Sequence, residues 1–501
     1  MAVSIYRNVY LKVTGGLEKT FHRWCQTAAA SNQKRKSVRS YGQPTPHTHP
    51  HLMQEGHVVP GLTQEEFRDR RFRLMENIWK HMLKTASTIQ NHIVVIPSAT
   101  RVYMTDKIPY PFRQNTDFLY MTGFQEPDSV LILHSLPNKT LPEHKSILFV
   151  QKKVPQTELW EGPRSGPDGA IDLLGIDSAY NIEELEKFLS TFVHDNQKFI
   201  LWYDYLSSPQ LPMHEVMRDF VANCRHSGFE SCRPLIQQLR LIKSDAEIKL
   251  MKKSTEIASE AMQEVMKSSH PLVTESQLYA KMDFECRIRE AEHLAYPPVV
   301  AGGTRANIIH YTANNQRILG NEMVLMDAGC EYRGYASDLT RTWPVNGRFT
   351  RPQRELYEAI LAVQEELIEL CASFTSLDQL FHAMCQLIGS KLQELGIVST
   401  NIGKIELGKI AYNYCPHHVG HYLGMDVHDT TLISRSIKLK PGMIITIEPG
   451  IYIRENNQRV PSKYRGLGIR IEDDILVTDV GPEVLTAHCP KTIEDIEKLF
   501  G

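Results

Sequence analysis

The sequence predicts an α/β protein with a mixed α/β domain at its N-terminal side and a second α/β domain after it. Three observations support this. The chain has 501 residues, which suggests two or more domains. Single strand-like segments alternate with helical patterns up to about Pro234. From Ser244 onward, helices alternate instead with pairs of strands that follow one another directly, and such pairs indicate antiparallel pairing rather than a Rossmann sheet.

The N-terminal segment, residues 1–53, differs in composition from the rest of the chain. It carries eight Lys and Arg residues against a single acid, Glu18, with interspersed Ser and Thr and no long apolar run. This composition is typical of a mitochondrial transit peptide, and the alternative is a basic tail without import function. We expect a mitochondrial location, and a cytoplasmic one for any form made without the presequence. Pro and His are frequent between Gly42 and Pro60, so residues 54–62 are predicted to be a linker.

Residues 63–235 are predicted to form the first folded domain. Thr63 and Glu66 have the spacing of a capping box, which opens a helix running toward Lys84. Further along, a helix is expected over Ile182–Phe192. The predicted strands are His92–Ile96, Val130–His134, Ile147–Val150 and Phe199–Tyr203.

Residues 240–501 are predicted to form the second domain. Ser244 and Glu247 make another capping box, in front of a helix with a clear apolar stripe. Two more helices are expected at Pro352–Cys371 and Ser376–Leu395.

Composition excludes several classes of protein. The formal net charge is −2 and no basic patch stands out, which disfavours nucleic-acid binding. Nine scattered cysteines without a C-x-x-C motif favour neither a disulfide framework nor a thiolate zinc site. No apolar run reaches the roughly 18 residues that span a bilayer, so no membrane insertion is expected.

Two aspartates mark the first part of a candidate site. Asp327 ends the apolar segment Met323–Asp327, and Asp338 follows eleven residues later. The residues Glu331–Gly334 can form a hairpin turn between them, which would bring the carboxylates together across adjacent strands. Taken alone, an Asp at a strand end is more often a turn or cap residue.

Three further segments carry polar side chains in unusual settings. Cys415–Asp429 contains four histidines interleaved with glycines, which alone could be a surface cluster. Glu448 ends an apolar strand just before a Pro-Gly turn, where it could serve as a cap. Arg470 and Glu472 share one face of a strand by the period of two, which also suits a simple ion pair.

The whole set indicates a metal site. Four carboxylates at the ends of apolar strands would be costly to bury without partners, and a shared cation resolves that cost. Four carboxylates and one imidazole can bind two divalent ions, with Mn²⁺ favoured and Fe²⁺, Co²⁺ or Zn²⁺ possible. Two such ions can share a water and lower its pKa, which yields a hydroxide nucleophile.

These motifs resemble those of a known superfamily. Asp327, Asp338, His421, Glu448 and Glu472, in this order and context, resemble the metal ligands of the methionine aminopeptidase, prolidase and aminopeptidase P superfamily, which has the pita-bread fold. Phe112–Asp128 resembles the N-terminal domain of Xaa-Pro aminopeptidases. The resemblance covers roughly residues 60–490. It implies a metallopeptidase that releases the N-terminal residue from peptides with proline in second position.

The resemblance also implies roles for individual residues. Asp327 and Glu472 would bridge or chelate both ions, Asp338 would hold one, and His421 and Glu448 the other. Glu448 would in addition be the general base. The residues implied in substrate binding or support of the site are His310, His417, His428, Tyr452 and Arg470. His418 is expected to be structural.

A substrate bond to proline explains why histidines are needed. That bond has no N–H, so backbone hydrogen bonding cannot recognise it, whereas histidines can polarise the carbonyl and protonate the leaving nitrogen. Three alternatives remain open: a prolidase limited to dipeptides, a trimming aminopeptidase for imported proteins that does not need proline, and a binding protein on an inactive scaffold. Homodimers are common in the family, so the resemblance also implies that this protein could form a homodimer.

Overall fold

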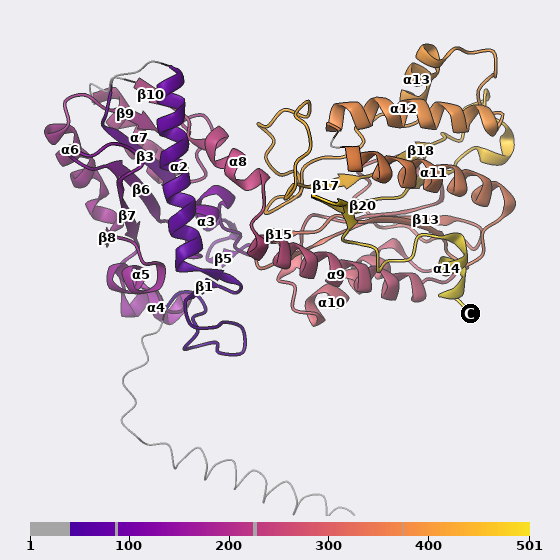
Figure 1. The fold of residues 1–501 in the computed structure, drawn as a ribbon. Helices are drawn as coiled ribbons and strands as arrows, with labels where there is room; N and C mark the ends of the chain where they lie inside the picture. The colour runs from indigo at the N-terminus through magenta and orange to yellow at the C-terminus, as the bar shows by residue number, and fades with distance from the viewer. Residues whose placement is uncertain (1–40, 86–88, 224–227, 374) are drawn as a thin grey trace, which may run out of the picture.

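The computed structural model describes residues 41–85, 89–223, 228–373 and 375–501 (Figure 1). Most of the predicted transit peptide, residues 1–40, lies outside the described residues. Within the described ranges, no helix is both long enough and apolar enough to cross a bilayer.

The first domain is built on a six-stranded mixed sheet. The central strands pair antiparallel, and parallel partners flank them at both edges. The strands, in spatial order, are β10 (Gly228–Glu230), β9 (Ile200–Trp202), β3 (His92–Pro97), β6 (Val130–Ser135), β7 (His144–Val150) and β8 (Ser178–Asn181). The four predicted strands are therefore confirmed.

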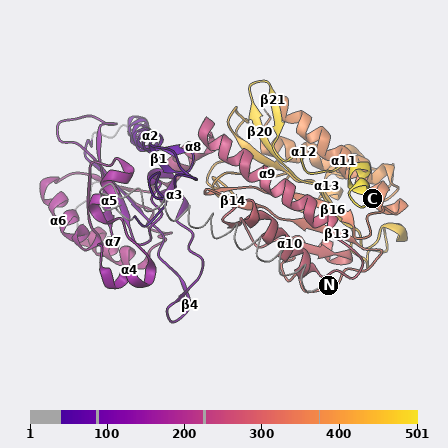
Figure 2. The same ribbon diagram turned by 90° about the horizontal axis from the view of Figure 1, so that it is seen from below.

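Helices cover both faces of this sheet. In β3, Val94 and Ile96 pack in the cluster that includes α2 (Gln64–Lys84). Ile93 and Val95 pack in the opposite cluster, with α6 (Leu185–Asp195) and α7 (Leu211–Asn223). Side chains alternate between faces along a strand, which explains why β3 is apolar throughout. The smaller elements are α3 (Thr116–Thr122), α4 (Pro155–Glu161), α5 (Gly166–Leu174) and the hairpin of β4 (Tyr103–Thr105) and β5 (Ile108–Pro109), which projects from the domain (Figure 2).

The segment predicted to be a linker, residues 54–62, is instead folded against this domain. Strands β1 (His57–Val59) and β2 (Leu62–Thr63) pair with each other. Val58 and Leu62 are buried in the core beside α2. The Gln43 amide donates to the carbonyls of Val58 and Gly123 at 3.1 Å each. The Pro and His content suggested a linker, but the apolar side chains in it are what determine its position.

The second domain contains short antiparallel sheets, as the strand-after-strand pattern predicted. Every strand pair described in this domain is antiparallel. The sheets are β12 (Val299–Gly302), β13 (Met323–Asp327) and β16 (Thr340–Pro344); β17 (Ile444–Ile447), β20 (Asp473–Thr478) and β21 (Gly481–Val484); β18 (Gly450–Tyr452) and β19 (Gly468–Arg470); and β11 (His293–Leu294), β14 (Cys330–Tyr332) and β15 (Tyr335–Ala336).

Two pairs of long helices enclose these sheets. In Figure 1 the strands β13, β17 and β20 run between one pair and the other. The predicted capping box is present, because Ser244 Oγ accepts from the Glu247 amide at 3.3 Å and the Glu247 carboxylate accepts from the Ser244 amide at 2.9 Å. The helices are α9 (Asp245–Lys267), α10 (Glu275–Ile288), α11 (Arg351–Leu370) and α12 (Leu377–Glu394), with the shorter α13 (Lys404–Tyr412) and α14 (Ile493–Lys498) beside them.

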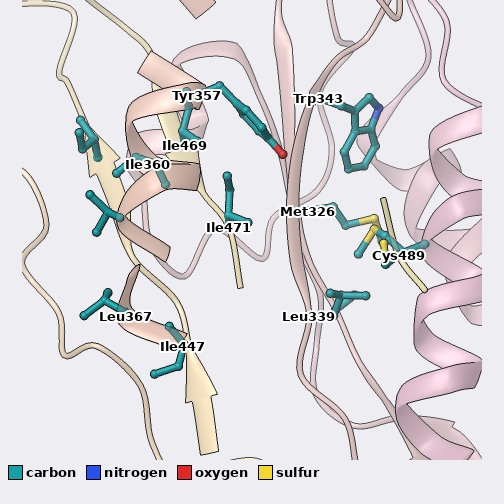
Figure 3. Close-up of a cluster of buried hydrophobic side chains, with 14 of the residues drawn as sticks. Met326, Leu339, Trp343, Tyr357, Ile360, Leu367, Ile447, Ile469, Ile471 and Cys489 are labelled. Carbon is teal, nitrogen blue, oxygen red and sulfur yellow. The ribbon is translucent and has the colours of Figure 1, made fainter. Parts of the chain in front are cut away.

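The core of this domain anchors the strands that carry the candidate site. Figure 3 shows Tyr357, Ile360 and Leu367 of α11 on the same side as Ile469, Ile471 and Ile447. Each candidate carboxylate is adjacent in sequence to at least one buried core residue. The adjacent pairs are Met326–Asp327, Asp338–Leu339, Ile447–Glu448 and Ile471–Glu472. Neighbours along an extended chain point to opposite sides, so each core contact turns its carboxylate away from the core.

Helix α8 (Arg233–Leu241) joins the two domains. It packs against α2 and α3 of the first domain, and α9 follows it after three residues. The predicted boundaries at residues 235 and 240 both fall within α8. We propose that the first domain extends to the end of this helix.

We expect His92 in β3 to make the stability of the first domain depend on pH. Trp202 Nε1 donates to His92 Nδ1 at 3.2 Å, and His92 Nε2 lies 3.2 Å from the Ile89 carbonyl oxygen. This arrangement fits a neutral ring with its proton on Nε2, and burial lowers the pKa of His92 from 6.5 to about 4. Between those pH values the unfolded chain binds the extra proton and the folded chain does not, so acid favours unfolding.

We therefore predict that the free energy of unfolding falls by up to about 3 kcal/mol as pH drops from 6.5 to 4 because of this group alone. The measurement is urea unfolding of the wild type and of His92→Gln across this range. The variant should show the shallower pH dependence; equal slopes would contradict the assignment.

Candidate metal centre and active site

The segment that carries His421 is tied to the strand that leads to Glu448. The Thr446 amide donates to the His421 carbonyl at 2.9 Å, and the Glu448 amide donates to the Val419 carbonyl at 2.9 Å. Gly420 allows this approach, since a Cβ at its position would overlap the Thr446 carbonyl oxygen. The glycines among the histidines therefore have a packing function.

Asp327 and Asp338 meet, but not as directly facing residues. The strand partner of Asp327 is Thr340, and Asp338 precedes β16 by two residues. Their carboxylates are joined through Tyr296, whose hydroxyl lies 2.5 Å from Asp327 Oδ1 and also contacts Asp338 Oδ1. The intervening hairpin is real, with Arg333 and Gly334 at its turn, where both have positive φ.

His421 and Glu472 complete a compact group with Asp338. One ligand atom from each of these three residues lies within 4.8 Å of the other two. His421 Nε2 is 3.3 Å from Asp338 Oδ2 and 3.8 Å from Glu448 Oε1. His421 Nδ1 lies 3.2 Å from the Tyr422 carbonyl oxygen. A proton on Nδ1 would be held there, which leaves Nε2 free to bind a cation.

The carboxylates of this group are close enough to repel one another when they are ionised. Burial, followed by the other carboxylates, raises the pKa of Glu472 well above its usual range. Burial is also the main cause that raises the pKa of Asp338, and it raises that of Glu448 to about 7. Burial lowers the pKa of His421, but the hydrogen bond to Asp338 and the nearby carboxylates outweigh it and raise this pKa to about 9. The donor set and its unbalanced negative charge fit divalent cations.

Arg470 forms hydrogen bonds with side chains of the candidate metal site and with residues next to it. Its guanidinium donates to Asp327 Oδ2 at 2.6 Å, to Tyr452 Oη at 2.8 Å and to Thr340 Oγ1 at 3.1 Å. Thr340 Oγ1 in turn donates to Glu472 Oε2 at 2.6 Å. Arg470 therefore forms its ion pair with Asp327, on another strand. The simple ion pair with Glu472 that the sequence allowed does not form.

His417 continues this chain of contacts. The Tyr452 hydroxyl and His417 Nε2 are 2.9 Å apart, and His417 Nδ1 is 2.9 Å from the His418 carbonyl oxygen. Burial, and then the charge of Arg470, lower the pKa of His417 to about 4. A neutral ring fits both contacts if Nδ1–H donates to the carbonyl and Nε2 accepts from Tyr452.

The other histidines divide into two kinds. His428 is exposed, and its ring centroid lies 4.5 Å from that of His421. His310 is also exposed, and its charge is among the causes, after burial, that lower the pKa of His428 to about 4. His418 instead stacks on Phe381 at 4.8 Å and faces Asp378, as expected for a structural residue.

An apolar cluster lies beside these side chains. Tyr452 packs there with Val299, Ala301, Ala306 and Leu325. Ile309 and Tyr311, which flank His310 in sequence, pack against the same cluster. The cluster therefore connects the His310 segment to the Tyr452 and His417 pair.

Three residues that support the site were not identified from the sequence. Tyr296 bridges two aspartates, Thr340 links Arg470 with Glu472, and Asp474 Oδ2 accepts from the Asp338 amide at 3.0 Å. None of them belongs to a motif with a recognisable spacing. Asp474 carried the only local signal of the three, because it is one of two adjacent acids that begin the buried strand β20.

Family models match both domains. Residues 249–479 match metallopeptidase family M24, and residues 67–202 match the aminopeptidase P N-terminal domain.

Individual relatives match over nearly the whole chain. Human Xaa-Pro aminopeptidase 3 is 51% identical over 470 residues, which cover 93% of this chain and 92% of the relative. The Arabidopsis thaliana protein named intermediate cleaving peptidase 55, mitochondrial, is 39% identical and covers 95% of this chain and 90% of its own. Among solved structures, zinc-substituted Escherichia coli aminopeptidase P in complex with product superposes with a TM-score of 0.78 at 33% identity, covering 88% of this chain and 98% of the other.

Gly420 provides a test of the geometry. We predict that Gly420→Ala pushes the His421 segment away from β17 and weakens metal binding by at least about 10-fold, because a ligand displaced by about 1 Å is badly placed. Isothermal titration with Mn²⁺ measures the effect.

The matched control is Gly403→Ala, where an added Cβ would meet nothing within 4 Å. It should bind metal like the wild type. Unchanged affinity in Gly420→Ala would mean that His421 is not a ligand or that the segment can shift without cost.

Proposed function

This chain belongs to metallopeptidase family M24, and on that premise we propose that it is a two-metal aminopeptidase that releases the N-terminal residue from peptides with proline in second position. The observation that carries the proposal is the buried convergence of Asp338, His421 and Glu472, with Asp327 and Glu448 in electrostatic contact with them.

The metal ligands we propose are those expected from the sequence. Asp327 and Glu472 would serve both ions, Asp338 would hold one, and His421 with Glu448 the other. Mn²⁺ is our proposed metal because carboxylate oxygens dominate the set. When bound, the two ions supply Lewis acidity toward the substrate carbonyl and make water acidic enough to attack near neutral pH.

Glu448 is our proposed general base. Its carboxylate lies 3.8 Å from His421 Nε2 and 3.7 Å from His417 Nδ1, so it borders both the ligands and the substrate histidines. In this position it can take the proton of the attacking water and return it to the leaving nitrogen.

Proline recognition is assigned to the histidines and the apolar cluster. His310, His417 and His428 would contact the substrate, with Tyr452 orienting His417 and Arg470 orienting Tyr452. Ile309 and Tyr311, which are partly exposed and pack against the apolar cluster, would offer an apolar wall for a pyrrolidine ring beside these histidines. Such a wall suits a residue that lacks an N–H.

Metal dependence and specificity are tested together. We predict that chelated enzyme does not cleave Ala-Pro-Ala, and that added Mn²⁺ restores its cleavage but gives at least about 100-fold lower kcat/KM for Ala-Ala-Ala. Chromatographic detection of free alanine provides the measurement. Cleavage without metal would refute the two-metal mechanism. Equal cleavage of both peptides would refute only the proline requirement.

A second candidate function has specific support. A relative at 39% identity carries the name intermediate cleaving peptidase, mitochondrial, and residues 1–53 have the composition of a presequence. We therefore also consider trimming of single residues from imported proteins, in mitochondria, without a strict need for proline. Equal cleavage of the two tripeptides would favour this function. A homodimer is proposed from the family resemblance alone, and its test is sedimentation of the purified enzyme.

Replacement of His417 tests its role in turnover. We predict that His417→Ala lowers kcat/KM for Ala-Pro-Ala by about 100-fold, in the range for a group that assists proton transfer or polarises a carbonyl. Mn²⁺ affinity should change little, since His417 is not a proposed ligand. The matched control is His418→Ala, which removes the neighbouring imidazole and should retain most activity. Unchanged turnover in His417→Ala would refute the assignment.

A further inference from the structure

Helix α8 contacts the loop that carries His428. This loop, residues 424–433, follows His421 and contains no helix or strand. Arg240 Nη2 donates to Asp426 Oδ2 at 2.7 Å and contacts Asp429 Oδ1. Gln237 Oε1 accepts from the Leu432 amide at 2.8 Å. The domain connector thus contacts the loop on both sides of His428.

Gln237 and Arg240 act from one face of α8. They are three residues apart, so they lie on the same side of the helix. Their exposed fractions are 2% and 3%, so both side chains are shielded from solvent. Lys243, two residues after α8, adds a third contact, with its Nζ 3.3 Å from Asp429 Oδ2.

The first domain holds the same loop from its own side. Arg113 donates to the Met425 carbonyl at 2.7 Å and to Asp426 Oδ1 at 3.2 Å. Thr116 Oγ1 donates to Asp426 Oδ1 at 2.7 Å. Arg240 Nη1 donates to Asp117 Oδ1 at 2.7 Å and so connects the loop to α3.

This interface is a network of ion pairs. Four cations, Arg113, Arg233, Arg240 and Lys243, pair with the carboxylates of Asp117, Asp426, Asp429 and Glu331. If the loop moved, these ion pairs would break and leave buried charges without partners, which is strongly unfavourable. The ion pairs therefore stabilise one position of the loop. Gly424 permits the close packing, because a Cβ there would overlap the Asp429 carboxylate.

We propose that Arg240, with Gln237 and Lys243, is a positioning group for His428, through which the connector and the first domain set the place of this histidine beside the metal ligands. The proposal rests on the function proposed above, since it assumes that His428 assists turnover. His428 itself is exposed, and its ring centroid is 4.5 Å from that of His421, so a small shift of the loop changes what it can reach.

The experiment is a double-mutant cycle on the full enzyme with Mn²⁺. We expect Arg240→Met to lower kcat/KM for Ala-Pro-Ala by about 10-fold or more, and to add less than about 2-fold when His428 is already Ala. Arg240→Lys should restore part of the loss. Effects that multiply independently in the double variant would overturn the proposal.

The matched control is Arg70→Met. Arg70 is equally buried, with its side chain 2% exposed against 3% for Arg240, and it also bridges the domains, through Glu247. It does not contact the loop. A loss of turnover in Arg70→Met as large as that in Arg240→Met would reduce Arg240 to a general structural role and overturn the proposal.

A second measurement does not need activity. Hydrogen exchange of residues 424–433 should rise at least about 10-fold in Arg240→Met and remain unchanged in Arg70→Met. Asp426→Asn, at a half-buried position, should give a smaller rise and covers the case in which Arg240→Met does not fold. Unchanged exchange in the loop variants would refute the positioning role even in a fully active enzyme. If instead no peptide is cleaved by the wild type, the proposed function fails, while the exchange result still decides whether the loop is held.

Discussion

Mutual repulsion among four carboxylates, two of them buried and two partly buried, is the constraint on which the candidate site of the second domain depends. Asp327, Asp338, Glu448 and Glu472 lie at or beside the ends of separate strands and converge on one site, where burial and neighbouring charge raise the pKa of three of them. Like charges at such range in a shielded site strongly disfavour ionisation. The fold must therefore supply both rigid support and positive charge, and the divalent cations that we propose would add to the charge of Arg470.

The support comes from the core. Met326, Leu339, Ile447 and Ile471 are buried next to the four carboxylates and hold their strands through apolar contacts with α11 and the opposite helices. Arg470 adds the one fully buried cation that contacts Asp327 directly. Because it also holds Tyr452, and through it His417, the same guanidinium links the ligand group to the residues proposed to bind substrate.

The two domains are coupled near this site rather than merely joined by a flexible link. The connector helix α8 ends in residues that bind the loop after His421, and Ser244 at the start of α9 donates to Glu66 of α2 at 2.6 Å. Buried ion pairs demand good geometry. Each ion pair across the interface therefore restricts how the two domains can shift relative to each other.

The sequence by itself determined the local features of this protein. Capping boxes, period-two strands and acids that terminate apolar strands are short-range signals, and they predicted the helices, the antiparallel pairing and the set of candidate ligands. Resemblance to a family then supplied roles that local pattern could not. The packing of residues 54–62 was not predicted, because the Pro and His content of a segment does not determine whether its apolar side chains become buried in a core.

Only the tertiary structure decided the partners of each side chain. Arg470 pairs with Asp327, 143 residues away, rather than with Glu472 two residues along its own chain. Tyr296 joins Asp327 and Asp338 from 31 and 42 residues away, and Arg240 reaches Asp429 across 189 residues. Such contacts follow from how strands and helices are placed in space. No spacing in the sequence encodes them, because every long-range pair depends on the packing of all the segments between its members.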